Sequence, residues 1–450
     1  MPYIPHSADD LRAMLAAIGV KSVDELFEDI PKNLRMKKTP RLPRPITELE
    51  LQREAAAAAA KTETFDRMNA FLGAGVYEHF IPAVVQHLAH RVETVTSYTP
   101  YQPEASQGNL TFMFEYQTAI CELTGMDVSN ASMYEGGTAC AEAALMAIRV
   151  NGKKRNRVLI SRALHPEYRQ ITETYLRALT GIEIVEIPVK DGATDLEALS
   201  RMADASTIGV LFQTPNFFGI VEDGPALSAA ARKAGALTLV CADPIALGVL
   251  EPPGAWGADI VCGEGQQLAS GLAYGGPYFG FFAAKMDYIR QMPGRIAGET
   301  VDVEGRRGFV LTLGTREQHI RRDRATSNIC TNQGLLALRG LVYLAALGPA
   351  GLKEVAEGCI ANAHYAADRV ASLPGWKMAH PGKPFFQEFA VDGPLPAAKV
   401  IASLRKKKVL PGVALSRWFP DMPNRLLVAV TEVKTKKQID ALVKALGNAK

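Results

Sequence analysis

Short apolar runs alternate with segments of helical periodicity through the middle of the chain. The apolar runs are rich in valine, isoleucine and leucine, and they cover residues 158–161, 182–187, 208–214 and 237–241. Helical patterns follow Pro166, span 196–202 and follow Pro225. This alternation predicts right-handed βαβ units and a mostly parallel sheet.

Capping patterns predict helices before this region, and a mixed pattern follows it. Ser7 with Asp10 three residues later predicts a helix that Gly19 ends, and Thr47 opens an alanine-rich helix. Beyond residue 330, helical patterns alternate with apolar runs, as in a smaller α+β domain. We therefore expect a helical N-terminal extension (1–65), a large α/β domain (66–329) and a small C-terminal α+β domain (330–450).

Composition narrows the class of protein without changing this architecture. Hydrophobic residues make up 48% of the 450 residues and charged residues 22%, which is typical of soluble globular proteins. The formal charge of +3 gives no reason to expect nucleic-acid binding. The six cysteines show neither a disulfide framework nor metal-ligand spacing, and the sequence has no signal-like N-terminus and no run of about 18 uncharged apolar residues. We expect a cytoplasmic protein that binds neither a metal nor a membrane.

An acid and a glycine-rich turn mark the expected carboxyl edge of the sheet. Asp243 follows a buried strand that Pro244 ends, so its carboxylate is expected where open α/β sheets bind ligands. There it could pair with the protonated nitrogen of a heterocycle or accept hydrogen bonds from the backbone beyond Pro244, and the sequence favours neither role. The turn Gly263–Gln266 falls where pyridoxal-phosphate (PLP) enzymes of this layout carry the lysine that holds the cofactor. No lysine occurs between Lys233 and Lys285.

Two loops offer further polar groups. Residues 97–104 (SYTPYQPE) combine two tyrosines, a glutamine and a glutamate with two prolines that disfavour regular structure, which favours a binding or interface loop over a spacer. The glycine-containing turn 130–138 leads directly into a helix. The N-terminus of that helix could bind a phosphate, or the turn could simply be capped by Thr138.

Four long runs of the sequence carry a resemblance to a known family. They are FLGAGVYEHFIPAVV, SYTPYQPEASQG, FEYQTAICELTGMDVSNASMYEGGTA and REQHIRRDRATSNICTNQGL. Together they resemble the N-terminal half of glycine decarboxylase, the P-protein of the glycine cleavage system, and the resemblance covers almost the whole chain. Proteins of this family occur as one long chain with two homologous halves or as two subunits, and only the second half or subunit carries the cofactor-binding lysine. Without a lysine near Gln266, this chain resembles the lysine-free first subunit.

The resemblance implies a fold-type I PLP protein that forms part of a larger enzyme. It implies a heterotetramer of two lysine-free and two lysine-bearing chains. In that assembly the partner subunit holds PLP, glycine is decarboxylated, and the aminomethyl group passes to the lipoyl arm of the H-protein. By resemblance, an interface loop contributes to the partner's catalytic site through Tyr98, Thr99, Tyr101, Gln102 and Glu104. A second loop is expected to contact the partner's PLP phosphate in trans through Thr326, Ser327 and Asn328, and Asp243 belongs to a vestigial site of this chain's own.

Two other functions stay open from the sequence. The chain could be a degenerate family member used as a binding or regulatory module, in which Asp243 and the turn at Gly136 are kept for packing. It could also be a self-sufficient PLP enzyme that uses an unusual lysine such as Lys285. Activity on mixing with a second subunit would exclude the module, and the absorbance band of a cofactor–lysine adduct in the isolated chain would reveal the self-sufficient enzyme.

Overall fold

The computed structural model describes residues 6–36, 38, 40–95, 99–152, 154–329 and 333–449. The chain divides into two compact units, Met1–Glu63 and Thr64–Lys450. The first unit contains the helices α1 (Ala8–Ile18) and α2 (Glu48–Ala59) and a 3-10 turn between them. Ser7 and Thr47 cap the two helices as expected, and Gly19 ends α1 in the left-handed conformation. None of the described residues of this unit is buried, so it has no core of its own.

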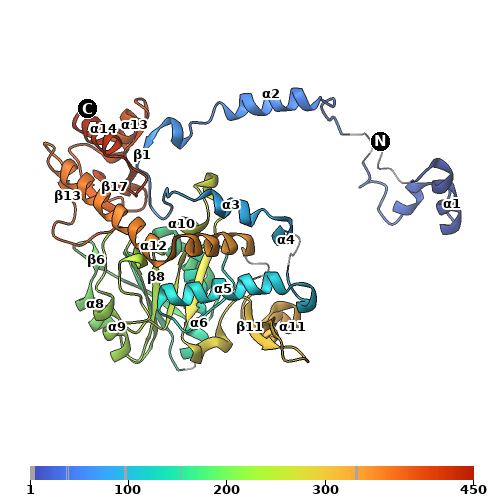
Figure 1. Cartoon of the computed structure of the whole chain (residues 1–450), viewed down its shortest axis with the longest axis horizontal. Coiled ribbons are helices and arrows are strands. Elements are labelled where there is room, and N and C mark those ends of the chain that lie inside the picture. Colours follow the sequence, from blue (N-terminus) through green and yellow to red (C-terminus); the bar gives the residue numbers. More distant parts are fainter. Residues whose placement is uncertain are drawn as a thin grey trace. The chain divides into compact units, whose positions relative to one another are not determined.

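A seven-stranded sheet forms the centre of the second unit (Figure 1). Its order is β2-β10-β9-β8-β7-β3-β4, in which β9, β8, β7, β3 and β4 are parallel and β10 runs antiparallel to both of its neighbours. The expected mostly parallel α/β sheet is therefore confirmed. The strands are β2 (Val128–Ser129), β3 (Arg157–Ser161), β4 (Glu183–Ile187), β7 (Thr207–Thr214), β8 (Leu237–Ala242), β9 (Ile260–Glu264) and β10 (Gly280–Ala284).

Helices cover both faces of this sheet. Side chains of α6 and α7 pack on one face, and side chains of α5, α8, α9 and α12 pack on the other. The helices are α3 (Ala83–Ala89), α4 (Val92–Val95), α5 (Gln107–Thr124), α6 (Gly136–Asn151), α7 (Pro166–Leu176), α8 (Leu196–Met202), α9 (Gly224–Lys233), α10 (Gln266–Ala269), α11 (Gln318–Arg321) and α12 (Gly334–Ala371). The result is a three-layer arrangement whose βαβ connections follow the pattern of the sequence.

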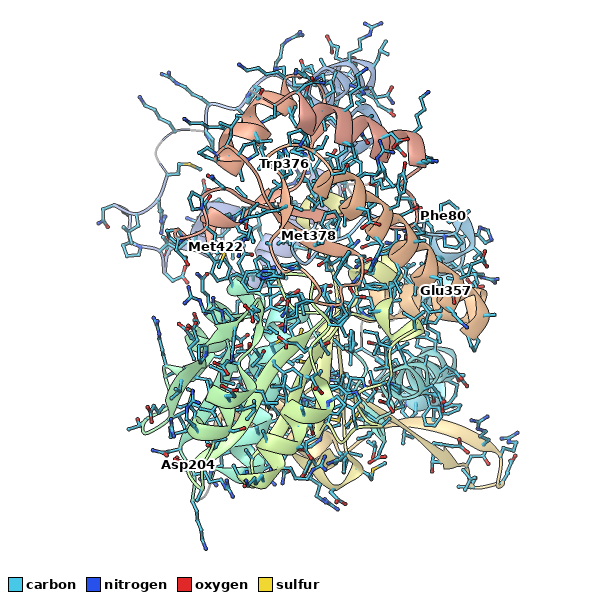
Figure 2. The ribbon with its side chains drawn as sticks, turned by 90° about the vertical axis from the view of Figure 1, so that its left-hand side faces the viewer. Phe80, Asp204, Glu357, Trp376, Met378 and Met422 are labelled. Carbon is cyan, nitrogen blue, oxygen red and sulfur yellow. The ribbon has the colours of Figure 1, made fainter. Side chains whose placement is uncertain are left out.

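A smaller antiparallel sheet, of order β13-β14-β17-β16, lies beyond the carboxyl ends of the parallel strands. In Figure 2, Met378 of this sheet lies above the large sheet, whereas Asp204, just before β7, lies at the lower end of the view. The remaining elements are β1 (Asn69–Ala70), β5 (Val189–Lys190), β6 (Ala193–Thr194), β11 (Ile296–Val301), β12 (Arg307–Thr312), β13 (Lys377–Met378), β14 (Glu388–Asp392), α13 (Ala397–Arg405), β15 (Val409–Leu410), β16 (Val413–Ala414), β17 (Arg425–Ala429) and α14 (Lys436–Gly447).

The long helix α12 joins the two sheets. It is interrupted at Gly348, which has a φ of 62° and precedes Pro349, so it consists of two helical pieces. Leu336 and Tyr343 of the first piece pack in the core of the large sheet, and Ala363 and Val370 of the second pack in the core of the small sheet. Among the described helices, α12 alone is long and apolar enough to cross a membrane, and these contacts account for its composition as a core helix. Because α12 serves both cores, the domain boundary expected at residue 330 stays a prediction.

Candidate functional site

Asp243 lies at the carboxyl end of β8, where its carboxylate is held on both sides. Its Oδ1 accepts hydrogen bonds from the backbone N–H groups of Ile245 (2.9 Å) and Ala246 (3.0 Å). Its Oδ2 accepts from the side-chain amides of Gln267 and Gln387, both at 2.9 Å. Burial raises the pKa of Asp243, and these hydrogen bonds oppose the rise. The backbone hydrogen bonds to Oδ1 are those expected if Asp243 has a structural role. The two side-chain amides occupy Oδ2, the oxygen with which a cofactor nitrogen would otherwise pair.

Gln266 lies at the turn where PLP enzymes of this layout carry the cofactor-binding lysine. Its side chain is fully buried and bonds the peptide of Tyr77 in both directions, through Oε1 to the N–H (3.1 Å) and through Nε2 to the carbonyl (3.0 Å). No lysine lines the cavity beside Asp243 among the residues that the structure describes. Lys285 bonds Asp259, which directly precedes β9, whereas Gln266 follows the other end of that strand. Lys285 therefore lies at the wrong edge of the sheet to hold a cofactor near Asp243.

The N-terminus of α6 is occupied by two carboxyl groups of the chain itself. Glu135 is the N-cap, and its side chain accepts from the N–H groups of Gly137 (2.5 Å) and Thr138 (2.8 Å). Glu264 accepts from the N–H of Gly136 at 3.0 Å, and burial raises the pKa of Glu264 to about 8. Thr138 is therefore not the N-cap but the N3 residue of the capping box, and its Oγ1 accepts from the N–H of Glu135 at 3.4 Å.

The space left between these groups is small. The cavity that Asp243 and Glu264 line holds about 30 Å³, enough for one or two water molecules. A Cβ atom placed on Gly136 would lie 2.8 Å from Tyr168 Oη, so the helix terminus is also closed from the side. The chain's own groups occupy each place that PLP would need. Glu135 and Glu264 bond the helix N-terminus where a phosphate would bind, the amides of Gln267 and Gln387 bond Asp243, and Gln266 stands where the lysine would be. The residues of this pocket therefore do not fit PLP.

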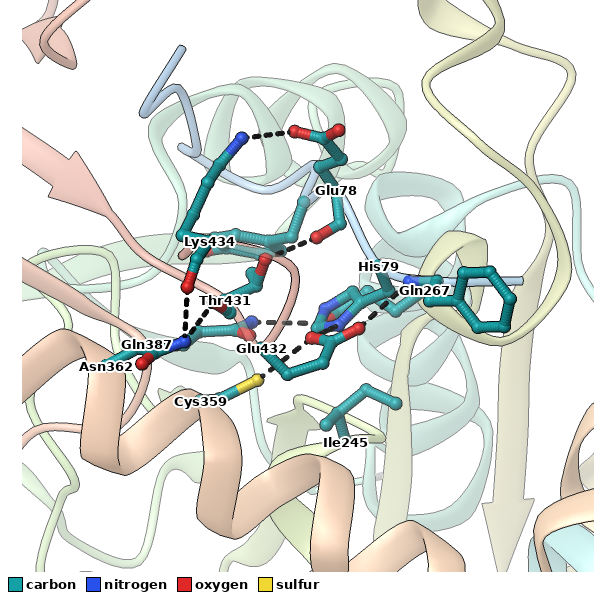
Figure 3. A network of polar contacts seen from close by, with 12 residues as sticks. Glu78, His79, Ile245, Gln267, Cys359, Asn362, Gln387, Thr431, Glu432 and Lys434 are labelled. Atoms are coloured by element: carbon teal, nitrogen blue, oxygen red, sulfur yellow. Dashed lines mark hydrogen bonds and ion pairs between the residues drawn. The ribbon is translucent and has the colours of Figure 1, made fainter. Parts of the chain in front are cut away.

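A buried network extends from Asp243 through Gln267 to His79, and Figure 3 shows its part around His79. His79 Nδ1 lies 2.7 Å from Glu432 Oε2, and its Nε2 lies 2.7 Å from Gln267 Oε1. Gln267 Nε2 donates to Asp243, so its Oε1 faces His79 as an acceptor. Both ring nitrogens of His79 therefore face oxygens, one of the Glu432 carboxylate and one of the Gln267 amide. Cys359 Sγ also donates to Glu432, at 3.3 Å.

The ligating atoms of His79, Cys359 and Glu432 lie within 4.8 Å of one another, a spacing that could hold a metal ion. The hydrogen bonds just described satisfy these groups without one. They also join three separate parts of the chain, since His79 precedes α3, Cys359 lies on α12 and Glu432 follows β17. The network accounts for this cluster as an electrostatic link between the two sheets.

The segment 71–80 closes the pocket from above. Glu388 on β14 accepts from the N–H of Ala74 at 2.7 Å and from Tyr77 Oη at 2.8 Å, and burial raises the pKa of Glu388 to about 7. The sequence pattern did not indicate Glu388, His79 or Gln387 as members of this site. One signal was present, because Glu388 interrupts an apolar run that reads as a buried strand.

The first predicted interface loop lies beside Arg295. Tyr101 Oη accepts from Arg295 Nη2 at 3.1 Å, and the Tyr101 ring meets His319 edge to face at 5.4 Å. Gln102 and Glu104 are exposed on a 3-10 turn. Tyr98 lies outside the described residues.

The second predicted loop also approaches Arg295. Thr326, Ser327 and Arg295 line one small cavity, whereas Thr99, Pro100 and Arg295 line a larger groove. Ser327 Oγ donates to Glu142 at 2.8 Å, and Asn328 is exposed. Neither space shares a lining residue with the cavity at Asp243. The structure thus brings the two loops together around one arginine, apart from the filled pocket.

The fold and the pocket together define the class of protein. Solved structures of glutamate decarboxylase from Lactobacillus brevis (TM-score 0.66, 13% identity, 93% of this chain and 97% of that chain) and of a sphingosine-1-phosphate lyase from Burkholderia pseudomallei (TM-score 0.61, 16% identity, 92% of each chain) share this architecture. The chain has the fold-type I architecture of PLP-dependent enzymes, as expected, with its pocket filled by its own side chains.

Closer relatives identify the family. The family model of the glycine cleavage system P-protein matches residues 1–446. Proteins named probable glycine dehydrogenase (decarboxylating) subunit 1 from Carboxydothermus hydrogenoformans and Geotalea daltonii are 49% and 51% identical over 447 residues, which cover 99% of each chain. A crystal structure of glycine decarboxylase (P-protein) of the glycine cleavage system, in inhibitor-bound form, covers 100% of both chains with a TM-score of 0.91 at 44% identity. The chain belongs to the glycine cleavage system P-protein family.

Proposed function

We propose that this chain is subunit 1 of a two-subunit glycine dehydrogenase (decarboxylating) of the glycine cleavage system. With a PLP-bearing partner subunit it decarboxylates glycine and transfers the aminomethyl group to the lipoyl arm of the H-protein. Two such chains and two partners form a cytoplasmic heterotetramer. Relatives that carry the name subunit 1 over the same length support this assignment.

One observation supports a role in trans above all others. The pocket at Asp243 is filled by glutamates and glutamines of the chain, while the loops at Tyr101 and Thr326 meet around Arg295 at a separate place. A protein that held its own cofactor would need an open pocket at Asp243. A protein that completes a partner's site needs the polar loops that meet around Arg295.

The two loops have different tasks in this proposal. Thr326, Ser327 and Asn328 contact the phosphate of the partner's PLP. Ser327 already donates its hydroxyl proton to Glu142, whereas the hydroxyl of Thr326 has no hydrogen-bond partner among the described residues. Thr326 is therefore the stronger candidate for the phosphate contact, since its proton is available for a charge-assisted hydrogen bond.

The loop with Tyr98, Thr99, Tyr101, Gln102 and Glu104 orients glycine at the partner's site. Arg295 fixes Tyr101 by a hydrogen bond and lies 5.6 Å from the centre of its ring, so this tyrosine is anchored before assembly. The exposed side chains of Gln102 and Glu104 can then reach the partner without moving the loop. The bound cofactor supplies the electron sink for decarboxylation, and this chain supplies position and charge.

The test is an exchange assay with separated subunits. Exchange of labelled bicarbonate into glycine is measured with H-protein on this chain, on the partner and on their mixture. We expect exchange from the mixture only. Full exchange by the partner alone would favour instead a binding or regulatory module, which the filled pocket would also suit, and exchange by this chain alone would contradict the role in trans.

A further inference from the structure

Arg295 also lines a groove of about 500 Å³, to which Thr326 and Ser327 do not contribute. Its lining comes from residues 89–95, from Thr99 and Pro100, from the helix α5, and from the first turns of α12. Figure 1 shows α3, α5 and α12 side by side at this place. The proposed function gives a task to Thr99 and Arg295, which line this groove, and none to the other lining residues.

The charged side chains that line the groove are basic. Its lining includes the guanidinium groups of Arg295 and Arg339 and the imidazole of His90, and none of the described residues that line it is acidic. Asn109 and Gln333 add amide groups. A concave surface with this lining attracts anions and repels cations.

The two arginines are not neutralised alike. Arg295 is 7% exposed, its Nε forms an ion pair with Glu317 Oε2 at 3.2 Å, and its Nη2 donates to Tyr101. Arg339 forms no ion pair or hydrogen bond with any residue in the described part of the chain, although it is half-buried. Guanidinium groups are normally matched by carboxylate or phosphate oxygens when they are removed from water. Arg339 is therefore a cation without a charged partner among the residues that the structure describes.

The start of α12 adds a second source of positive potential. Gln333 is the N-cap residue, and its side chain does not cap the helix. Gly334 and Leu335, whose N–H groups have no acceptor within the helix, line the groove next to Arg339. The exposed end of the helix dipole and the guanidinium of Arg339 thus act on the same space.

We propose that this groove binds an oxyanion of a small molecule, a carboxylate or a phosphate group, through Arg339, Arg295 and the N-terminus of α12. The inference rests on the proposed function, in which the available oxyanions are the glycine carboxylate and the phosphate of the partner's PLP. The apolar side chains of Val95, Phe112 and Met113 line the rest of the groove and suit the uncharged part of such a ligand. Arg339 is then a binding residue of the shared site.

The experiment uses the assembled enzyme with Arg339→Gln. Arg339→Lys keeps the charge but loses the forked geometry, and Arg290→Gln removes an exposed arginine that does not line the groove. Size-exclusion chromatography and thermal melting confirm assembly and folding of each variant. The PLP dissociation constant and the KM for glycine in the exchange assay are then measured.

A carboxylate ligand predicts a rise in the KM for glycine of about tenfold or more in Arg339→Gln, with PLP affinity unchanged. A phosphate ligand predicts a similar loss of PLP affinity. In either case Arg339→Lys should be intermediate and Arg290→Gln should match the wild type. The inference is overturned if both constants stay within about twofold of the wild type, or if only assembly is weakened, since the groove would then be a protein interface.

Failure of the proposed function would look different, because the wild-type mixture would then show no exchange. In that case the isolated full chain is melted with inorganic phosphate and with acetate at constant ionic strength. Stabilisation of the wild type and of Arg290→Gln, but not of Arg339→Gln, would uphold the groove as an oxyanion site. Equal behaviour of the three proteins would overturn it.

Discussion

Glu264 accepts a hydrogen bond from the backbone N–H of Gly136 at 3.0 Å, across 128 positions of sequence. This contact places a carboxyl group of β9 at the N-terminus of α6, where a helix dipole would favour a phosphate. The Glu264 carboxyl group therefore occupies the position at which this fold would be expected to bind a phosphate.

The first prediction concerns the pH dependence of stability. The pKa of Glu264 is raised from 4.5 to about 8 in the folded chain, so the folded state holds a proton that the unfolded state releases. Its contribution is fully present below about pH 4.5 and is lost as the pH rises through 8, with a slope approaching about 1.4 kcal/mol per pH unit. Glu388, with a pKa raised to about 7, acts in the same direction.

Glu264→Gln imitates the protonated group and should flatten this dependence between pH 5 and pH 8. Urea unfolding of the isolated chain at several pH values measures the effect. The exposed Glu251→Gln serves as the control and should leave the slope unchanged. A steep slope that survives in Glu264→Gln would show that another group carries the proton.

The second prediction is that no lysine of this chain holds PLP. Borohydride reduction of the isolated chain after incubation with PLP, followed by mass spectrometry, should give no stoichiometric pyridoxyl adduct. The physical reason is that Gln266 occupies the turn, and Lys285 is bonded to Asp259 at the opposite end of β9. A full adduct on any single lysine would restore the self-sufficient enzyme as an explanation.

The large sheet could be predicted from local hydrophobic patterns. The site could be predicted only in part, because its contacts join residues that lie far apart in the sequence. The edge position of Asp243 follows from a buried strand that Pro244 ends, and both lie within one short stretch. Gln387, which bonds Asp243, lies 144 positions beyond it and directly precedes β14. Glu388, the first residue of β14, lies 311 positions beyond its partner Tyr77. Nothing in local periodicity reports such a distance, so the filling of the pocket could be learned only from the fold.

The two interface loops show the same limit. Prolines and tyrosines singled out residues 97–104 because unusual composition is visible locally. Arg295, which binds Tyr101 and lines a cavity with Thr326, lies in a stretch that carries no comparable signal. The sequence therefore indicated both loops but not the residue at which they meet.

The third prediction concerns the N-terminal unit. Large apolar side chains such as Ile18, Phe27 and Leu49 are exposed there, and none of its described residues is buried. Such a surface is typical of a segment that packs against a partner. A chain that begins at Thr64 should melt at the temperature of the full chain but associate more weakly with the partner subunit, as measured by analytical ultracentrifugation. Unchanged association would exclude this role.

The fourth prediction concerns the cofactor of the assembled enzyme. Thr326→Ala should weaken PLP binding by about 1.5–3 kcal/mol, because a hydrogen bond to a charged group is lost. Titration of PLP into the reconstituted complex measures this change. The matched control is Thr315→Ala, which removes an exposed threonine that does not line the cavity beside Arg295. Equal affinities in the two variants would place the phosphate elsewhere.

The fifth prediction separates positioning from assembly. Gln102 is exposed on the turn after Tyr101, which Arg295 holds in place, so Gln102→Ala removes a side chain that the isolated chain does not need. If this side chain orients glycine, bicarbonate exchange by the complex should fall by up to about a hundredfold, while assembly and PLP content stay intact. Gln170→Ala, an exposed glutamine on α7, should retain full exchange. Full activity of Gln102→Ala would show that the loop serves the interface alone, because a group that orients substrate cannot be lost without slowing the reaction.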